Sequence, residues 1–481
     1  MVRLAIAFAG SLAGASALAA LVALTVSGTL PIEAGPFRLD ALSLFLAVAV
    51  TVISAVVHVF ARRYMDGEAG RDRFFARLSG LTAVVLVLLA ADHMALFAAA
   101  WVAMGWLLAD LIATNRAWPQ ARAAGRLART HFLVGGAALA VGLWALAQAT
   151  GTASLSTAVV AVGAGAASGQ TGALAVACAA FALAAAIQCG LVPFHRWLMS
   201  SMTAPTPVSA FMHAGLVNAG GILIARTMPV FEAVPHALAV LVVLGATSAL
   251  AGAVVATAQA DVKRGLAAST VAQMGFMVLQ CGLGLPAAAM AHLVLHGAYK
   301  ASLFLGAGSA VAARRLPGGV ETAVGRDAVA AAVLAAVAGG AVFALVTGKL
   351  AGGLDAGAVL VAFAAIAVAH AALVAAGRET ESGVARILGI PLALAAIAAV
   401  YGAVVALSET ALAAVPGMTG AAPLGPVHVL VVAVFALAWA ATAAGLHRRA
   451  GGLADRVYVL ALRAGQPAPA TVTAVRRQYS A

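Results

Sequence analysis

Long apolar runs, separated by short polar turns, recur along almost the whole chain. The runs reach roughly 20 residues, the length that an α-helix needs to cross about 30 Å of hydrocarbon. Only 9% of the 481 residues are charged, whereas soluble globular domains carry about 25%. The sequence therefore predicts an all-α polytopic membrane protein with about 14 transmembrane helices, and it excludes a soluble fold.

The first apolar run is long for the core of a signal peptide, and a second run follows it closely. We therefore expect it to be retained as the first of fourteen helices. The predicted spans are residues 4–30, 41–61, 74–91, 94–114, 127–149, 171–192, 205–227, 236–257, 262–283, 287–312, 328–347, 356–377, 385–408 and 427–447. They make up one transmembrane domain, residues 1–447, and leave a tail, residues 448–481.

Arginine and lysine are distributed very unevenly between alternate loops. If the N-terminus is cytoplasmic, 24 basic residues lie on the cytoplasmic side, while Arg38, Arg226 and Lys349 lie outside and Lys300 lies within a span. Because loops rich in Lys and Arg stay in the cytoplasm, we expect an even number of spans, cytoplasmic termini and insertion into a bacterial inner membrane. The net charge of +12 follows from this topology, so it does not predict nucleic-acid binding.

The tail contains a short amphipathic stretch. Leu453, Val457 and Leu460 recur at helical spacing, and Arg456 and Arg463 lie elsewhere around the same helix. Such a pattern is typical of a helix that lies in the membrane interface. Docking of a partner on this cytoplasmic helix is the alternative interpretation.

Three cysteines, Cys178, Cys189 and Cys281, lie in or beside apolar runs without CxxC spacing or paired histidines. This arrangement favours packing and does not indicate a disulfide framework, a zinc site or an iron–sulfur site. No flavin or haem motif is present either, and the loops are too short for a soluble catalytic domain. We therefore expect a non-enzymatic chain that carries no cofactor of its own.

Lysine is rare in this chain, because only Lys263, Lys300 and Lys349 accompany 25 arginines. Arginine keeps its proton in proteins, whereas a desolvated lysine can release it. The three lysines are therefore candidate titrating positions. The alternative is a compositional bias that replaced lysine by arginine and spared three by chance.

Two histidines share a helical face with a lysine in the middle of a predicted span. His292, His296 and Lys300 follow one another at four-residue steps, which places them on one side of the helix. Ionisable groups inside a bilayer are costly, and they usually face the bundle interior or a water-filled cavity. The pattern predicts a proton pathway, with helix-bridging hydrogen bonds as the alternative role for the histidines.

Prolines interrupt a second polar stretch, "LVPFHRWLMSSMTAPTPVSAFMHAGLVNAGGILIAR". Pro205 and Pro207 are expected to break a helix and to free carbonyl groups, which is tolerated only where protein or water satisfies them. His213 follows two turns later and His195 precedes the prolines, and both are candidate residues of the proton pathway. "VTGKLAGG" around Lys349 is the expected counterpart in the second half, so the sequence predicts two inverted repeats that contain broken helices.

These stretches resemble the antiporter-like membrane subunits of respiratory complex I, multi-subunit Na+/H+ antiporters and membrane-bound hydrogenases. The resemblance rests on "PFHRWLMSSMTAPTPVSAFMHA" and "ADVKRGLAASTVAQMGFMVL…HLVLHGAYKASLFLGAGS". It covers about residues 38–309 well and extends more loosely to about residue 447. Within the family, "HAGLVNAGG", "STVAQMGFMVLQCGLGL" and "NRAWPQARAAGRLARTHFLV" are most similar to DabB-type subunits of inorganic-carbon accumulation systems.

The resemblance implies that His213, His296, Lys300 and Lys349 carry the proton. Two positions depart from the complex I pattern. Val102 stands where that type has a glutamate after a tryptophan, and Gln188 stands where it has a lysine. Asp110 or Asp92 are the remaining candidates to replace the glutamate, although each is equally suited to a helix end.

The DabB-like resemblance implies a proton-conducting subunit that energises uptake of CO2 or bicarbonate. Its expected partner is a large soluble DabA-like zinc protein on the cytoplasmic face, similar to a carbonic anhydrase, which holds the zinc and performs the chemistry. A cation/proton antiporter or respiratory-complex subunit is the first alternative. A non-conducting membrane anchor for a soluble enzyme is the second.

Overall fold

The computed structural model describes residues 28, 30–309, 326–351, 353–376, 383–446 and 451–472. Helices make up almost all of it, together with one small hairpin, β1 (Ile32–Ala34) and β2 (Phe37–Leu39). The long helices are α2 (Ala41–Tyr64), α3 (Arg71–Ala90), α4 (Met94–Ile112), α5 (Pro119–Thr150), α7 (Thr171–Gln188), α12 (Ala237–Thr257), α13 (Val262–Gly282), α14 (Pro286–Leu305), α16 (Arg326–Thr347), α17 (Ala356–Ala376), α18 (Gly383–Leu412) and α19 (Pro426–Ala443). The shorter ones are α6 (Leu155–Gly163), η1 (Ser168–Gln170), α8 (Arg196–Ser200), η2 (Ser201–Thr203), α9 (Thr206–Ala214), η3 (Leu216–Asn218), α10 (Ala219–Arg226), α11 (Met228–Glu232), η4 (Ala307–Ser309), α20 (Leu453–Ala464) and η6 (Pro469–Thr471).

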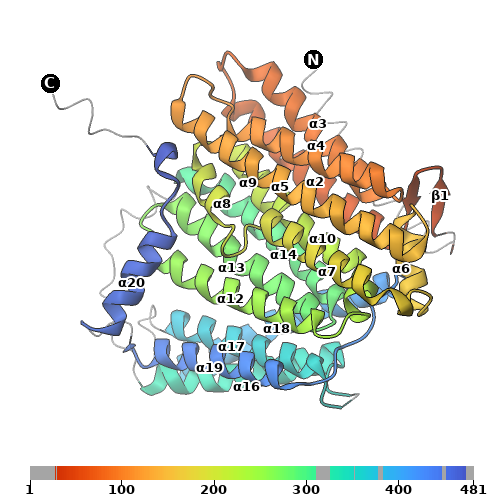
Figure 1. Ribbon diagram of the computed structural model, residues 1–481. Helices are drawn as coiled ribbons and strands as arrows, with labels where there is room; N and C mark the ends of the chain where they lie inside the picture. Colours follow the sequence, from red (N-terminus) through yellow and green to blue (C-terminus); the bar gives the residue numbers. More distant parts are fainter. Residues whose placement is uncertain are drawn as a thin grey trace.

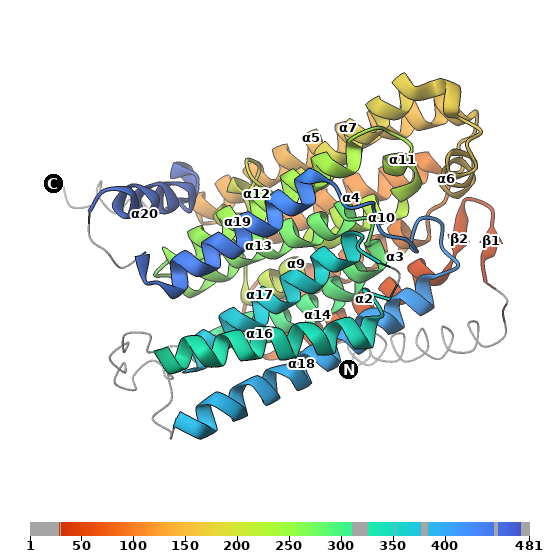
Figure 2. The ribbon, with the colours of Figure 1, turned by 90° about the horizontal axis from the view of Figure 1, so that it is seen from below.

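The long helices run side by side as one bundle (Figures 1 and 2). The β1–β2 hairpin and α6 lie at one end of the bundle, and α20 lies across the opposite end (Figure 1). Helices α2 to α14 form the larger part, and α16 to α19 form a second group beside α14 (Figure 2). The predicted all-α polytopic class is confirmed, and the chain is a multi-pass protein of the inner membrane.

Thirteen of the predicted spans coincide with helices in the described part of the chain. The first predicted span, residues 4–30, lies almost entirely outside the described residues. Among the residues described, eleven helical segments are long and apolar enough to cross a membrane. The two remaining predicted spans, α13 and α14, carry more polar residues, and the bundle encloses many of their side chains.

Burial separates a central layer from a lipid-facing one. In the segment Thr206–Arg226, which comprises α9, η3 and α10, 89% of the residues in an 18-residue stretch are buried within the bundle, whereas only 11% are buried in α19. Small residues let the central helices approach closely, as expected for packing in lipid. At Gly275 of α13, for example, an added Cβ would lie 2.5 Å from the backbone nitrogen of Ala249 in α12. The polar candidate residues are therefore held in a tightly packed centre.

The tail packs against the bundle through α20. Ala461 is buried against Met199, Val255, Ala267 and Ala268, and the backbone nitrogen of Ala468 donates to Ser200 Oγ at 2.9 Å. Leu453, Val457 and Leu460, the predicted apolar row, are exposed. The helix thus touches the bundle with its alanine side and presents the leucine row beside it, an arrangement that suits insertion into the membrane interface.

Candidate functional site

The proline-containing segment is interrupted twice, and the prolines stand at the first interruption. Pro205 is the N-cap of α9 and Pro207 lies in its first turn, where a missing N–H costs no helical hydrogen bond. A second interruption follows at Gly215, whose φ of −130° and ψ of −55° end α9 before η3. His213 therefore lies two turns beyond the prolines, as the sequence predicted, and just before this second interruption.

Side chains satisfy the carbonyl groups that the second interruption frees. Gln188 Nε2 of α7 donates to the carbonyl of Leu216 at 3.1 Å, and Asn218 Nδ2 donates to that of Ala214 at 2.8 Å. Gly297 of α14 is close to the same Ala214 carbonyl, since an added Cβ would lie only 2.5 Å from that oxygen. Gln188 thus supports the irregular backbone at the position where the complex I pattern has a lysine.

Lys300 lies in the interior with only 2% of its surface exposed. Its Nζ donates to the carbonyl of Leu266 at 2.9 Å and to the hydroxyl of Ser269, both on α13. None of the Asp and Glu residues that the structure describes is buried, and none forms a salt bridge with Lys300. A buried amine that is held by neutral acceptors and lacks a carboxylate is well suited to gaining and losing a proton.

His213 contacts the same turn of α13 as Lys300 does. Its Nδ1 is 3.0 Å from Thr270 Oγ1, and its ring stacks on Phe304 of α14 with centroids 4.4 Å apart. Within the described residues, its buried Nε2 has no hydrogen-bond partner. Lys300 and Lys263 are its electrostatic neighbours, so the structure places His213 beside the lysine that the sequence selected.

The histidine face of α14 extends from Lys300 into the bundle. The rings of His292 and His296 stack with centroids 5.8 Å apart. His296 is 6% exposed, and its electrostatic neighbours are His292, Lys300 and His213. The predicted one-sided row is therefore present, and His213 joins it from the interrupted helix. We call Lys300, His213, His296, His292, Ser269 and Thr270 the interior cluster.

Lys263 and His195 lie nearer the end of the bundle that carries α20. Lys263 Nζ donates to the carbonyl of Ala204 at 3.3 Å, just before Pro205. It therefore satisfies a carbonyl group at the first interruption. His195 Nε2 is 3.0 Å from the carbonyl of Ala464, the last residue of α20. The structure thus gives His195 a contact with the tail, outside the interior cluster.

The segment around Lys349 is a turn between two continuous helices. Residues 348–351 follow the end of α16, and α17 begins at Ala356. The prediction of a second broken helix at "VTGKLAGG" is therefore wrong, because its glycines end one helix instead of interrupting it. Lys349 forms a salt bridge with Glu409 of α18, so it is paired, unlike Lys300.

Asp92 and Asp110 occupy opposite helix ends. Asp92 accepts hydrogen bonds from the hydroxyl of Ser154 and from the backbone nitrogen of Ser156, so it fixes the start of α6. Asp110 lies in the last turn of α4, where it pairs with three arginines. In the part of the chain that the structure describes, neither carboxylate contacts Gln188 or Lys300.

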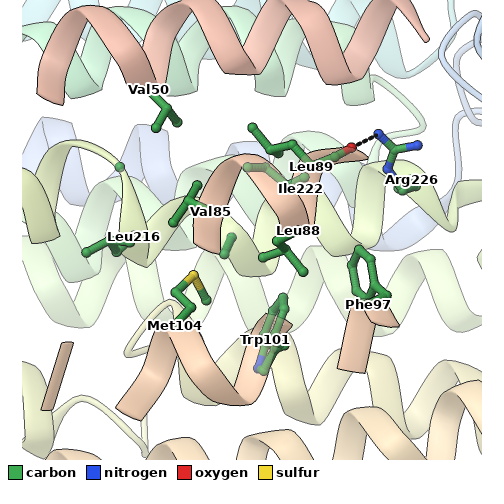
Figure 3. A pocket seen from close by; sticks show the side chains of 12 residues that line it. Val50, Val85, Leu88, Leu89, Phe97, Trp101, Met104, Leu216, Ile222 and Arg226 are labelled. Carbon is green, nitrogen blue, oxygen red and sulfur yellow. Dashed lines mark hydrogen bonds between the residues drawn. The ribbon is translucent and has the colours of Figure 1, made fainter. Parts of the chain in front are cut away.

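The surroundings of the missing glutamate are apolar. Trp101 lines a small cavity of about 20 Å³, together with Gly215 and Leu216 of the second interruption, and Arg226 stands at one edge (Figure 3). A volume of this size holds about one water molecule. Val102 points elsewhere, because its Cγ2 lies 2.8 Å from where a Cβ on Gly136 of α5 would be. The positions of the glutamate and the lysine in the complex I pattern are thus held by Val102 and Gln188, neither of which is ionisable.

Sequence reasoning did not single out the hydroxyl groups of the cluster. Ser269 and Thr270 contact the interior lysine and histidine directly. The signal was available, since two adjacent hydroxyl residues stand in the middle of the predicted span that became α13. Among the residues described, no group of three or more His, Cys, Asp or Glu side chains is arranged to hold a metal ion.

Two family models match the chain. Residues 91–321 match the transmembrane region of NADH:quinone oxidoreductase and Mrp antiporter subunits, and residues 24–75 match the N-terminus of complex I chain 5. The first match contains the interior cluster from end to end.

Curated relatives match over the same region. A probable inorganic carbon transporter subunit DabB1 of Halothiobacillus neapolitanus is 39% identical over 289 residues, which are 60% of this chain and 52% of the relative. A probable DabB of Bacillus subtilis is 37% identical over 58% of this chain and 54% of its own length. NADH-quinone oxidoreductase subunit L of Mycobacterium tuberculosis is 34% identical over 59% and 45%. The chain spans about half the length of the curated relatives that it matches.

Solved structures share the fold over nearly the whole chain. A chain of the Mrp complex from Dietzia is similar with a TM-score of 0.61 and 25% identity, covering 96% of this chain and 59% of that one. A chain of respiratory complex I from Thermus thermophilus has a TM-score of 0.52 and 21% identity, covering 97% and 99%. The chain thus shares its overall helical fold with chains of the Mrp complex and of respiratory complex I.

Proposed function

The chain belongs to the antiporter-like membrane subunits of NADH:quinone oxidoreductases and Mrp antiporters, and we propose that it conducts protons to energise inorganic-carbon uptake. The proposal names CO2 or bicarbonate because the relatives at 37–39% identity are DabB-type subunits. It rests above all on Lys300, a buried amine that is held by a carbonyl and a hydroxyl and that has no carboxylate partner within the described ranges.

The interior cluster supplies the proton-handling groups. Lys300 Nζ donates to Leu266 and Ser269 when it is protonated, and both acceptors remain in place for the neutral amine. His213 and His296 are its electrostatic neighbours, and each retains a ring nitrogen without a partner among the described residues. A ring nitrogen of this kind accepts a proton that a nearby group releases. Stepwise transfer along α14, through His296 to His292, follows from this arrangement.

The chemistry of carbon hydration is assigned to a partner. We infer that a large soluble zinc protein of DabA type binds the cytoplasmic face and that proton flow through this chain favours one-way hydration of CO2. One observation supports this division: the relatives are named as subunits of an inorganic carbon transporter. The contact between His195 and Ala464 lies on the cytoplasmic face, which is expected to meet that partner.

The decisive experiment measures accumulation of labelled bicarbonate in cells that carry the chain and its soluble partner. We expect accumulation to collapse when a protonophore is added and to be lost in Lys300→Ala. Accumulation that survives the protonophore would refute coupling to protons. Full activity of Lys300→Ala would instead favour a membrane anchor. Purification of the complex, followed by metal analysis, tests the partner, which should be large and contain zinc.

A cation/proton antiporter is the second candidate, because a chain of the Mrp complex is similar over 96% of this chain. The two candidates differ in the ion. In proteoliposomes, an imposed Na+ gradient should leave internal pH unchanged if only protons are conducted. Acidification or alkalinisation that depends on Na+ would replace the carbon-uptake proposal by antiport.

A further inference from the structure

Charged side chains from two helices and a loop converge on the end of α4. The Asp110 carboxylate lies 2.6 Å from Arg129 of α5, 3.4 Å from Arg116 of the α4–α5 loop and 3.6 Å from Arg77 of α3. Asp110 balances only one of these three guanidinium groups. We call Asp110, Arg77, Arg116 and Arg129 the Asp110 cluster. One carboxylate thus orients three arginines, and the cluster keeps an excess of positive charge.

An aromatic side chain places this cluster at the membrane–water boundary. The Arg129 guanidinium stacks 4.3 Å from the ring centroid of Trp106, which is 47% exposed and lies one turn before Asp110. Trp118, on the loop beside Arg116, is 55% exposed. Exposed tryptophans at the ends of membrane helices are typical of the headgroup region.

Farther along α5 from Arg129, the exposed surface where α4 meets α5 is apolar. We call this surface the α4–α5 seam. Leu133 lies one turn beyond Arg129 on α5 and is 46% exposed, and Val134 is 52% exposed. The seam is closely packed, because an added Cβ on Gly136 would lie 2.8 Å from Val102. A lipid-facing apolar strip therefore ends at a group of positively charged side chains.

We propose that the Asp110 cluster and the α4–α5 seam bind one anionic phospholipid. The phosphate contacts Arg116 and Arg129, and an acyl chain lies along Trp106 and Leu133. Guanidinium groups match phosphate oxygens with paired N–H donors, and the side chains of Arg116 and Arg129 are 57% and 33% exposed. Asp110 holds the arginines in position, which gives this carboxylate a role apart from proton transfer.

A free oxyanion, such as phosphate or bicarbonate, shares the recognition chemistry of a lipid headgroup. The structure favours lipid, because an exposed tryptophan and an apolar strip adjoin the arginines and contribute nothing to a small soluble anion. Both sources are separated in the experiment by using each as a probe.

The experiment uses the full chain, purified in a neutral detergent, with phosphatidylglycerol and phosphatidylcholine as probes and native mass spectrometry as the readout. We expect phosphatidylglycerol to bind in preference. Arg116→Gln should lower its affinity roughly fivefold, because each arginine near an anionic headgroup contributes about that factor. Arg116→Gln with Arg129→Gln should lower it more than about tenfold. Arg116 is 57% exposed at its side chain, so its replacement removes little packing.

Arg63→Gln is the matched control, because Arg63 is exposed in the last turn of α2 and lies outside the cluster. If Arg63→Gln lowers the affinity for phosphatidylglycerol as much as Arg116→Gln does, the effect comes from the total charge of the protein and the proposal is overturned. Equal binding of phosphatidylglycerol and phosphatidylcholine would also overturn it. If inorganic phosphate or bicarbonate displaces the lipid at low millimolar concentration, the site belongs to a soluble oxyanion. Trp106→Leu tests the contact with the acyl chain. This variant should bind phosphatidylglycerol more weakly while its affinity for inorganic phosphate stays unchanged.

Discussion

The interior of the bundle differs from its rim, the ends of the long helices, in how charged side chains are paired. At the rim, Asp40 pairs with Arg226 at 2.9 Å, Asp110 meets three arginines, and Lys349 pairs with Glu409. In the interior, the acceptors of Lys300 among the residues that the structure describes are a carbonyl and a hydroxyl. An ion pair holds both partners in their charged forms, whereas an amine with neutral acceptors is free to change its charge. Fixed charges thus shape the protein at the rim, and exchangeable ones lie inside.

Asp40 illustrates the balance at the rim. Burial opposes its ionisation, but Arg226 and the backbone and hydroxyl of Ser43 outweigh this effect and lower the pKa of the carboxyl. The same carboxylate caps the start of α2. The pair therefore stays ionised near neutral pH and acts as a structural clasp between α2 and α10.

The largest expected effect comes from replacing Lys300 by arginine, with the same replacement at Lys349 as the comparison. Lys300→Arg keeps a positive charge that cannot leave, so proton flux in proteoliposomes should fall by about a hundredfold or more, the factor that one lost proton-transfer group typically causes. Lys349→Arg preserves the pairing with Glu409 and should retain most of the flux. Equal losses in the two variants would erase the distinction between interior and rim. Full flux in Lys300→Arg would contradict the role of the interior amine.

Helix periodicity was sufficient to place the α14 face, because positions four residues apart must lie on one side whatever the neighbouring helices do. The partners of that face depend on tertiary packing, so Thr270 and Ser269 were missed. The pairing of Lys349 with Glu409 joins residues 60 positions apart, and no local pattern indicates it. Glycines around Lys349 were compatible with either a broken helix or a turn, and only the continuity of α16 and α17 decides between them.

A smaller effect is expected from the hydroxyl of Thr270. Thr270→Val keeps the volume but removes the contact with His213 Nδ1, so flux should fall several-fold and stability by about 1 kcal/mol. Thr227→Val is the control, because Thr227 is equally buried and its hydroxyl bonds only to the carbonyl of Leu223 in its own helix. That variant should lose similar stability without loss of flux. Parallel losses of flux would indicate that the hydroxyl matters only for folding.

The rim pair is tested by a double-mutant cycle that reads thermal unfolding in detergent. Lys349→Met leaves Glu409 without its cation, and Glu409→Gln leaves Lys349 without its anion, so each single change should destabilise the protein. The double variant should recover part of this loss, with a coupling of about 1 kcal/mol, because both side chains are partly exposed. Proton flux should change little in all three. A strong loss of flux in the double variant would place Lys349 in the pathway after all.

The smallest effect concerns His195, the rim histidine that contrasts with His213 inside. Burial lowers the pKa of His195 from 6.5, the bond to the Ala464 carbonyl partly opposes this shift, and Arg196 adds to it. A histidine whose folded pKa is depressed favours the docked tail in its neutral form. The stability that it contributes is complete above about pH 6.5 and declines as the pH falls toward the lowered pKa.

Hydrogen exchange of α20 amides should therefore accelerate modestly between pH 7.5 and 5.5, after correction for intrinsic rates. His195→Gln retains a donor for Ala464 but does not titrate, so its corrected exchange should stay level. A pH response that persists in this variant would assign the effect to other groups and would leave His195 as a purely structural contact.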